Sequence, residues 1–164
     1  MSEKIELVEL RPQRVATIRR TVPRSGLGAF FAEVIPKLQA AIAAQGGKPA
    51  GPPYGRYFNS DPAAFDTEAG IPFTGSVKAT GDVGVGELPG GPAAKAVHIG
   101  PYETLPQEYP RIKAWLRDKG KHPAVGPWES YVDDAAITPH AKLLTGRLVR
   151  RRRSRPATPF APTH

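Results

Sequence analysis

The chain has 164 residues, enough for one domain with its own hydrophobic core and too few for two ordinary domains. Apolar residues make up 40% and charged residues 23%, as in soluble globular domains, and 17 glycines with 19 prolines indicate many turns. Because the sequence has no cysteine, it excludes disulfides, thiolate catalysis and cysteine-ligated zinc, and we expect a cytoplasmic protein. The start shows no secretion signal, and no apolar run is long enough to predict a membrane span.

The net charge of +8 is concentrated near the carboxyl-terminal end. Removing six arginines within 147–155 from the 23 basic residues leaves 17 against 15 acidic residues. We therefore expect a nearly neutral folded domain at 1–149 and a disordered Arg/Pro-rich tail at 150–164. No helix-turn-helix or aromatic stacking platform accompanies the tail, so no specific nucleic-acid partner and no membrane partner is expected. The six arginines are Arg147, Arg150, Arg151, Arg152, Arg153 and Arg155.

Extended structure is predicted at the start of the chain, over 4–10 and 14–19, where apolar and β-branched residues surround a turn. Apolar residues then recur at helical spacing from Leu27 to Ile42, and Gly46-Gly47 supplies the stop. Pro36 lacks an N–H, so this helix is expected to kink there or to begin late.

Strands are predicted at 54–58, 76–79, 83–88 and 93–99, each next to Gly- or Pro-containing turns. The polar stretch 59–74 has no readable period, and no element is assigned to it.

A second amphipathic helix is predicted from Leu105 to Leu116, with Gly120 as its terminator and Trp115 as a structural residue beside the apolar stripe. A strand at 128–132 and a last strand at 142–149 complete the chain.

The order strand, helix, Gly-Pro turn, aromatic strand occurs twice. Aligning Tyr57 with Tyr131 also aligns Pro53 with Pro127 and Gly55 with Glu129. The predicted fold class is α+β: two βαββ repeats related by a pseudo-twofold axis, with both helices on one face of a mainly antiparallel, concave sheet and a cleft between the repeats.

Glu129 is the candidate functional carboxylate. In a strand, Glu129 and Tyr131 project to one face, while Trp128 and Ser130 project to the other. A carboxylate beside aromatic rings suits a lipophilic organic cation, and the equivalent Gly55 leaves space opposite. The alternative interpretation is a solvated strand carboxylate among core aromatic residues.

Five short segments occur in order along the chain: Gly51–Tyr57, Glu68–Pro72, Val85–Gly91, Ala96–Glu103 and Gly126–Tyr131. Together they resemble the signature blocks of GyrI-like effector-binding domains, which are also the ligand-sensing halves of MerR- and AraC-type bacterial multidrug regulators. The resemblance covers roughly residues 5–149.

The resemblance implies a pocket between the repeats in which Glu129 meets cationic drugs. It places Trp128 and Tyr131 beside this carboxylate and adds Tyr102 from the Gly-Pro-Tyr block. With Gly55 and Tyr57 from the other repeat, these residues form the predicted ligand site. Because no DNA-binding module precedes residue 5, the chain resembles the stand-alone members of the family.

The candidate site and the resemblance together suggest three alternative functions. The first is a receptor or sequestering protein for a hydrophobic small molecule, cationic or neutral. The second, implied by related hydrolases that open strained rings of genotoxic natural products, uses Glu129 to activate water and Tyr131 or Tyr102 as proton donor. The third is a protein inhibitor that binds DNA gyrase, as some family members do. No cofactor or metal is expected, because the four histidines lack ligand spacing.

Overall fold

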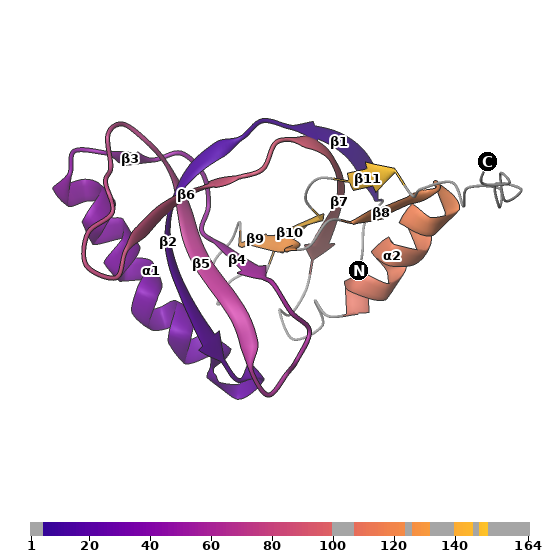
Figure 1. Ribbon diagram of the computed structural model, residues 1–164, viewed down its shortest axis with the longest axis horizontal. Helices are drawn as coiled ribbons and strands as arrows, with labels where there is room; N and C mark the ends of the chain where they lie inside the picture. Colours follow the sequence, from indigo (N-terminus) through magenta and orange to yellow (C-terminus); the bar gives the residue numbers. More distant parts are fainter. Residues whose placement is uncertain (1–4, 100–106, 124–125, 132–139, 146–147, 151–164) are drawn as a thin grey trace, which may run out of the picture.

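The computed structural model describes residues 5–99, 107–123, 126–131, 140–145 and 148–150 (Figure 1). A short 3-10 turn at Arg24–Gly26 leads into the first helix. The helices and strands are β1 (Glu6–Leu10), β2 (Gln13–Val22), α1 (Leu27–Ala44), β3 (Lys48–Pro49), β4 (Tyr54–Tyr57), β5 (Phe65–Thr74), β6 (Gly84–Leu88), β7 (Gly91–Ile99), α2 (Glu108–Asp118), β8 (Lys121–Pro123), β9 (Trp128–Tyr131), β10 (His140–Thr145) and β11 (Leu148–Arg150).

The main sheet has the order β1-β7-β10-β9-β4-β5-β2-β6, with β3 added to β5, while β8 and β11 form a separate pair. Every described strand pair is antiparallel. The predicted α+β class with a mainly antiparallel sheet is therefore confirmed.

The two halves of the chain supply matching elements in the same order. A strand, a helix and three strands run as β2, α1, β3, β4, β5 and again as β7, α2, β8, β9, β10. The halves meet where β4 pairs with β9, and there Gly55 lies opposite Glu129. If β1 is exchanged with β6, β2 with β7, β4 with β9 and β5 with β10, the order of the strands in the sheet is reversed. A twofold relation between the repeats requires this correspondence of strands.

Both helices lie on the same face of the sheet. Phe31 of α1 makes an edge contact with the Tyr131 ring, whose centroid is 5.6 Å away, and Tyr109 of α2 hydrogen-bonds to Glu129. Glu129 and Tyr131 share one face of β9, so the predicted arrangement of the helices is correct. Figure 1 shows α1 against β2 and β5, and α2 at the other end beside β7 and β8.

The apolar face of α1 forms the larger core. Segment Arg24–Ala44, with mean hydropathy 1.4, is long and apolar enough to cross a membrane by length and composition, although no membrane span is predicted from the sequence. In the fold, one face of this helix packs on β2 and β5, and its other residues are largely exposed. Its buried residues are Phe30, Val34, Leu38 and Ile42, and they meet Ala16, Ile18, Ala69, Ile71 and Phe73 of the sheet.

The opposite face of the sheet has its own buried cluster of Val15, Tyr54, Leu88 and Trp128. Tyr54 is fully buried, and its hydroxyl donates to Glu68 Oε2 at 3.0 Å. The Tyr54 ring lies directly over Gly70, where an added Cβ would come within 2.4 Å of ring atoms.

Gly70→Ala is therefore expected to lower the free energy of unfolding by about 1–3 kcal/mol, because the buried Tyr54 ring has to move. Gly86→Ala is the matched control: Gly86 also lies in a strand, but its Cβ would meet nothing within 4 Å. Urea denaturation of both variants checks this. Equal midpoints for the two variants would contradict the close packing of Tyr54 on Gly70.

Several elements differ from the prediction. Of the two alternatives for α1, a kink at Pro36 or a late start, the late start is wrong, since the helix starts at Leu27 and continues through Pro36. No strand forms at 76–79, because the backbone of Lys78 bonds instead to the side chain of Gln45, with N···O distances of 2.9 and 2.8 Å. A strand, β5, occupies part of the unassigned stretch at 59–74.

The last predicted strand, 142–149, is two strands with different partners: β10 pairs with β7 and β9, whereas β11 pairs with β8. Strand β11 includes Arg150, the first residue assigned to the tail, and residues 151–164 lie outside the described part of the chain. Trp115 is half-buried beside the core formed by Ile112 and Leu116, as expected of a structural residue.

Candidate functional site

The alternation of β9 places Glu129 on the helical face of the sheet, where its side chain is buried with 7% exposure. Its two carboxylate oxygens accept hydrogen bonds from two tyrosines. The Tyr109 hydroxyl donates to Oε1 at 2.6 Å, and the Tyr131 hydroxyl donates to Oε2 at 2.7 Å. The carboxylate is thus held in a fixed orientation, and Glu129 is not the solvated residue of the alternative interpretation.

Aromatic rings from both halves of the chain surround this carboxylate. The Tyr57 hydroxyl lies 3.3 Å from that of Tyr131, and Phe31 packs edge-on against the Tyr131 ring. Unlike Glu129, these rings and that of Tyr109 are only half-buried. We call this group, Glu129 with Phe31, Tyr57, Tyr109 and Tyr131, the Glu129 site. It combines a buried charge with a partly accessible aromatic surface.

Burial governs the protonation of the Glu129 site. Loss of solvation raises the pKa of Glu129 above its ordinary value of 4.5, and the tyrosine hydrogen bonds and the nearby His98 oppose that rise. Burial and the charge of Glu129 raise the pKa values of Tyr109 and Tyr131 well above 10.0. Both phenols therefore remain protonated donors at neutral pH.

The structure brings four of the predicted site residues together: Glu129, Tyr131, Tyr57 and Gly55. The space beside Gly55 is not open, contrary to expectation, because an added Cβ would lie 2.7 Å from Phe31 Cζ and 2.9 Å from the Tyr131 hydroxyl. Trp128 points to the opposite face of the sheet and packs with Val15, Tyr54 and Leu88. Tyr102 lies outside the described residues.

Sequence reasoning did not assign Phe31, Tyr109 or His98 to the site. Phe31 and Tyr109 belong to the apolar stripes of the two helices. Helical spacing alone does not distinguish an aromatic residue of the core from one that lines a ligand site. His98 is buried with 4% exposure at the end of β7 and acts on Glu129 electrostatically. Within the described residues, no cluster of three His, Asp or Glu side chains could hold a metal ion.

Comparison with known proteins identifies the chain at the level of a family and a fold. The family model of GyrI-like small molecule binding domains matches residues 3–148. A search of curated protein sequences gave no match. The solved structure of the EcmrR C-terminal domain is similar with a TM-score of 0.80 and 20% identity, covering 90% of this chain and 98% of that one.

In the cryo-EM structure of the EcmrR–DNA complex, the TM-score is 0.77 at 20% identity, and the match covers 87% of this chain but 56% of the EcmrR chain. This chain therefore spans just over half of that longer protein. A hydrolase from Listeria innocua gives a TM-score of 0.63 at 13% identity, covering 85% of this chain and 90% of that one. The structure of SAV2435 bound to tetraphenylphosphonium gives a TM-score of 0.55 at 11% identity, and the match covers 87% of this chain and 92% of that one. At these identities the likeness shows the fold.

Proposed function

The chain belongs to the family of GyrI-like small molecule binding domains, and we propose that it is a receptor or sequestering protein for a hydrophobic organic cation that binds in a cleft at the Glu129 site. One observation carries this proposal: a buried carboxylate lies among half-buried aromatic rings contributed by both halves of the chain. We further propose that a ligand reaches the carboxylate from the helical face, past these partly exposed rings.

This arrangement matches the chemistry of a lipophilic cation. The ring faces cover an apolar body and attract a positive charge through their quadrupoles. The carboxylate supplies a full negative charge, and two unit charges about 6 Å apart interact by roughly 3 kcal/mol at an effective dielectric constant near 20. SAV2435, which shares the fold, has been solved with tetraphenylphosphonium, so this cation is a suitable probe.

Tyr109 and Tyr131 have a positioning role in this proposal. Their hydroxyls hold the carboxylate oxygens at 2.6 and 2.7 Å, so Glu129 does not need to reorganise when a cation arrives. Phosphonium and quaternary ammonium groups have no N–H to donate. Such a cation therefore leaves both tyrosine hydrogen bonds in place and interacts through charge and ring contact.

The proposal predicts a pH-dependent affinity for tetraphenylphosphonium. Because burial raises the pKa of Glu129 in the free protein, its carboxyl stays protonated to a higher pH than that of an exposed glutamate. A cation favours the ionised form, so affinity should increase as pH rises through that pKa and then level off. Below the plateau, binding should release a proton.

Isothermal titration calorimetry between pH 4 and pH 8, in two buffers with different ionisation enthalpies, measures both effects. The wild-type protein should bind one equivalent of tetraphenylphosphonium, whereas the neutral analogue triphenylphosphine oxide should show no such pH dependence. Absence of saturable binding, or an affinity for the cation that does not change with pH, would contradict the proposal.

A hydrolase is the second candidate, favoured by the contact between the Tyr131 hydroxyl and the Glu129 carboxylate at 2.7 Å. In that function Glu129 would activate water while the phenol donates a proton to the leaving oxygen of a strained ring. Mass spectrometry of an epoxide incubated with the protein separates the two functions. A hydrated product that requires Glu129 identifies an enzyme, and an unchanged compound supports the receptor.

A further inference from the structure

Two basic segments that are distant in the sequence are joined by one strand pair. Residues 111–121, from α2 and the start of β8, contain five basic residues and one acidic residue, Asp118. Strand β11 ends at Arg150, and the sequence continues with four more arginines, at 151–153 and 155. Pairing of β8 with β11 places Arg150 at the register position opposite Lys121. The five basic residues of the first segment are Arg111, Lys113, Arg117, Lys119 and Lys121.

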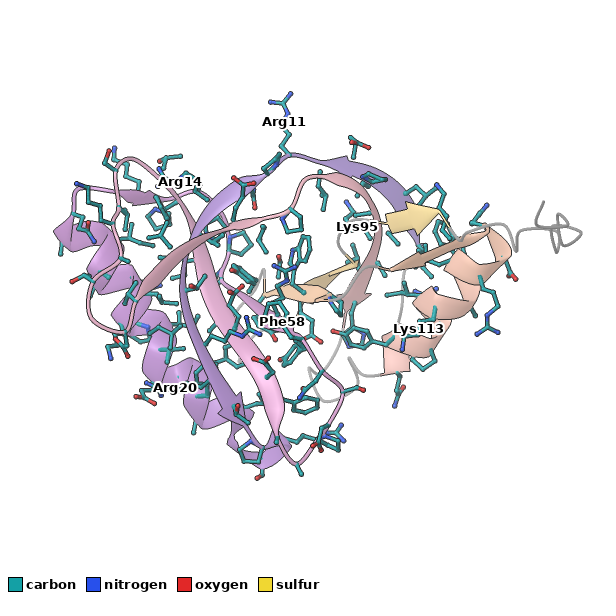
Figure 2. All side chains as sticks on the ribbon, viewed as in Figure 1. Arg11, Arg14, Arg20, Phe58, Lys95 and Lys113 are labelled. Atoms are coloured by element: carbon teal, nitrogen blue, oxygen red, sulfur yellow. The ribbon has the colours of Figure 1, made fainter. Side chains whose placement is uncertain are left out.

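Lys113 and Arg117 of α2 are exposed. The described salt bridges lie in the α1 half, where Arg20 pairs with Glu33 and Lys37 pairs with Asp82. Among the described residues, none involves Lys113 or Arg117. Figure 2 shows the contrast: Arg20 lies on the α1 half, and Lys113 lies on α2 at the other end of the molecule.

Lys119 has a structural role that explains its position. Its ammonium group lies 5.3 Å from the centroid of the Trp115 ring and follows the carboxyl end of α2, where positive charge is favourable. Lys113 is in the middle of the helix and has neither contact. Collecting such charges on one surface costs electrostatic repulsion, which a bound polyanion would offset.

We propose that the surface formed by α2 and the start of β8, here called the basic surface, binds the phosphate backbone of nucleic acid without sequence preference. A row of phosphates presents regularly spaced negative charges, and lysines and arginines on one surface neutralise several of them at once. Phosphate contacts carry no sequence information, which agrees with the lack of a base-reading motif in the sequence. Helix α2 also carries Tyr109 of the Glu129 site, but the phosphate contacts proposed here use lysine and arginine side chains and do not depend on the proposed function.

A membrane surface fits the same residues less well. Peripheral amphipathic helices insert an apolar face between lipids. In α2 that face is already used inside the domain, since Ile112 and Leu116 are completely buried. Among residues 5–98, 109–121 and 126–131, Leu7 on β1 is the large hydrophobic residue that is exposed, and it belongs to another element. Charge without an insertable apolar face favours nucleic acid.

Fluorescence anisotropy with a labelled 20-base-pair DNA duplex of arbitrary sequence tests the proposal, at salt concentrations from 25 to 200 mM. The wild-type chain should bind with an affinity that falls steeply with salt. Lys113→Ala/Arg117→Ala should weaken binding at 0.1 M salt by about tenfold or more and reduce the magnitude of the salt slope by about two. Lys48→Ala/Lys78→Ala makes the same change in net charge on the α1 half and should change binding less than twofold.

Circular dichroism confirms that each variant is folded, and tetraphenylphosphonium titration shows whether the Glu129 site is intact. Three results would overturn the proposal: no duplex binding at 25 mM salt, equal losses in the two double variants, or full binding by Lys113→Ala/Arg117→Ala with complete loss on removal of residues 151–164. Binding to vesicles that contain 30% phosphatidylglycerol, without binding to DNA, would identify a membrane partner instead and would equally overturn it.

Discussion

Glu129→Gln is expected to weaken tetraphenylphosphonium binding by about 10- to 100-fold, which corresponds to roughly 1.4–2.7 kcal/mol. The substitution keeps the shape of the side chain and removes its negative charge. The loss is large because the carboxylate is buried and both of its oxygens are held by tyrosines, so water screens its charge poorly. Binding of the neutral triphenylphosphine oxide should change little. Calorimetric titration of both compounds gives the two affinities.

Glu68→Gln provides a matched control on the opposite face of the sheet. Like Glu129, Glu68 accepts a hydrogen bond from a tyrosine, in this case Tyr54 at 3.0 Å, but it is half-buried and lies away from the helices. Its substitution should leave tetraphenylphosphonium affinity unchanged within a factor of two. If the two variants lose affinity equally, the effect is one of net charge, and Glu129 does not contact the cation.

Trp128→Ala is expected to lower the free energy of unfolding by about 3–5 kcal/mol, because it leaves a cavity the size of an indole ring. Trp128 is 2% exposed and packs with Tyr54 and Leu88 on the face opposite the helices. The Arg56 guanidinium, 5.6 Å from the centroid of the ring, would also lose its aromatic contact. Urea denaturation followed by circular dichroism measures the change.

The milder substitution Trp128→Phe separates packing from ligand contact. It retains an aromatic ring in the same cluster and should leave enough folded protein for titration. Tetraphenylphosphonium affinity should equal that of the wild type, because Trp128 and Glu129 occupy opposite faces of β9. A tenfold loss of affinity in folded Trp128→Phe would show that the tryptophan belongs to the ligand site, as the resemblance to regulators implied.

The sequence revealed the two halves of the fold through local signals: the helical stripes, the Gly-Pro turns and the spacing that aligns Tyr57 with Tyr131. Strand β5 was missed because its sequence contains a glycine, a proline and charged residues, all unusual in a central strand. The structure explains why they are tolerated. Gly70 makes room for the Tyr54 ring. Strand β4 pairs with β5 only from Thr67 to Gly70, so the missing N–H of Pro72 removes no hydrogen bond to β4.

The strand period correctly placed Glu129 and Tyr131 on one face, because alternation depends only on neighbouring residues. The other half of the site depends on tertiary contacts. Tyr109 reaches the carboxylate only because α2 packs beside β7 and β8 on the face that carries Glu129, and Phe31 fills the space beside Gly55 only because α1 lies on the same face. No pattern within either helix distinguishes these rings from the core residues next to them.

A crystal structure of the chain with tetraphenylphosphonium would locate the bound cation. We expect the phosphonium centre within about 6 Å of the Glu129 carboxylate, with phenyl groups against the Tyr131, Tyr57 and Phe31 rings and both tyrosine hydrogen bonds to Glu129 retained. A cation bound on the Trp128 face, or elsewhere with the Glu129 site unchanged, would contradict this expectation.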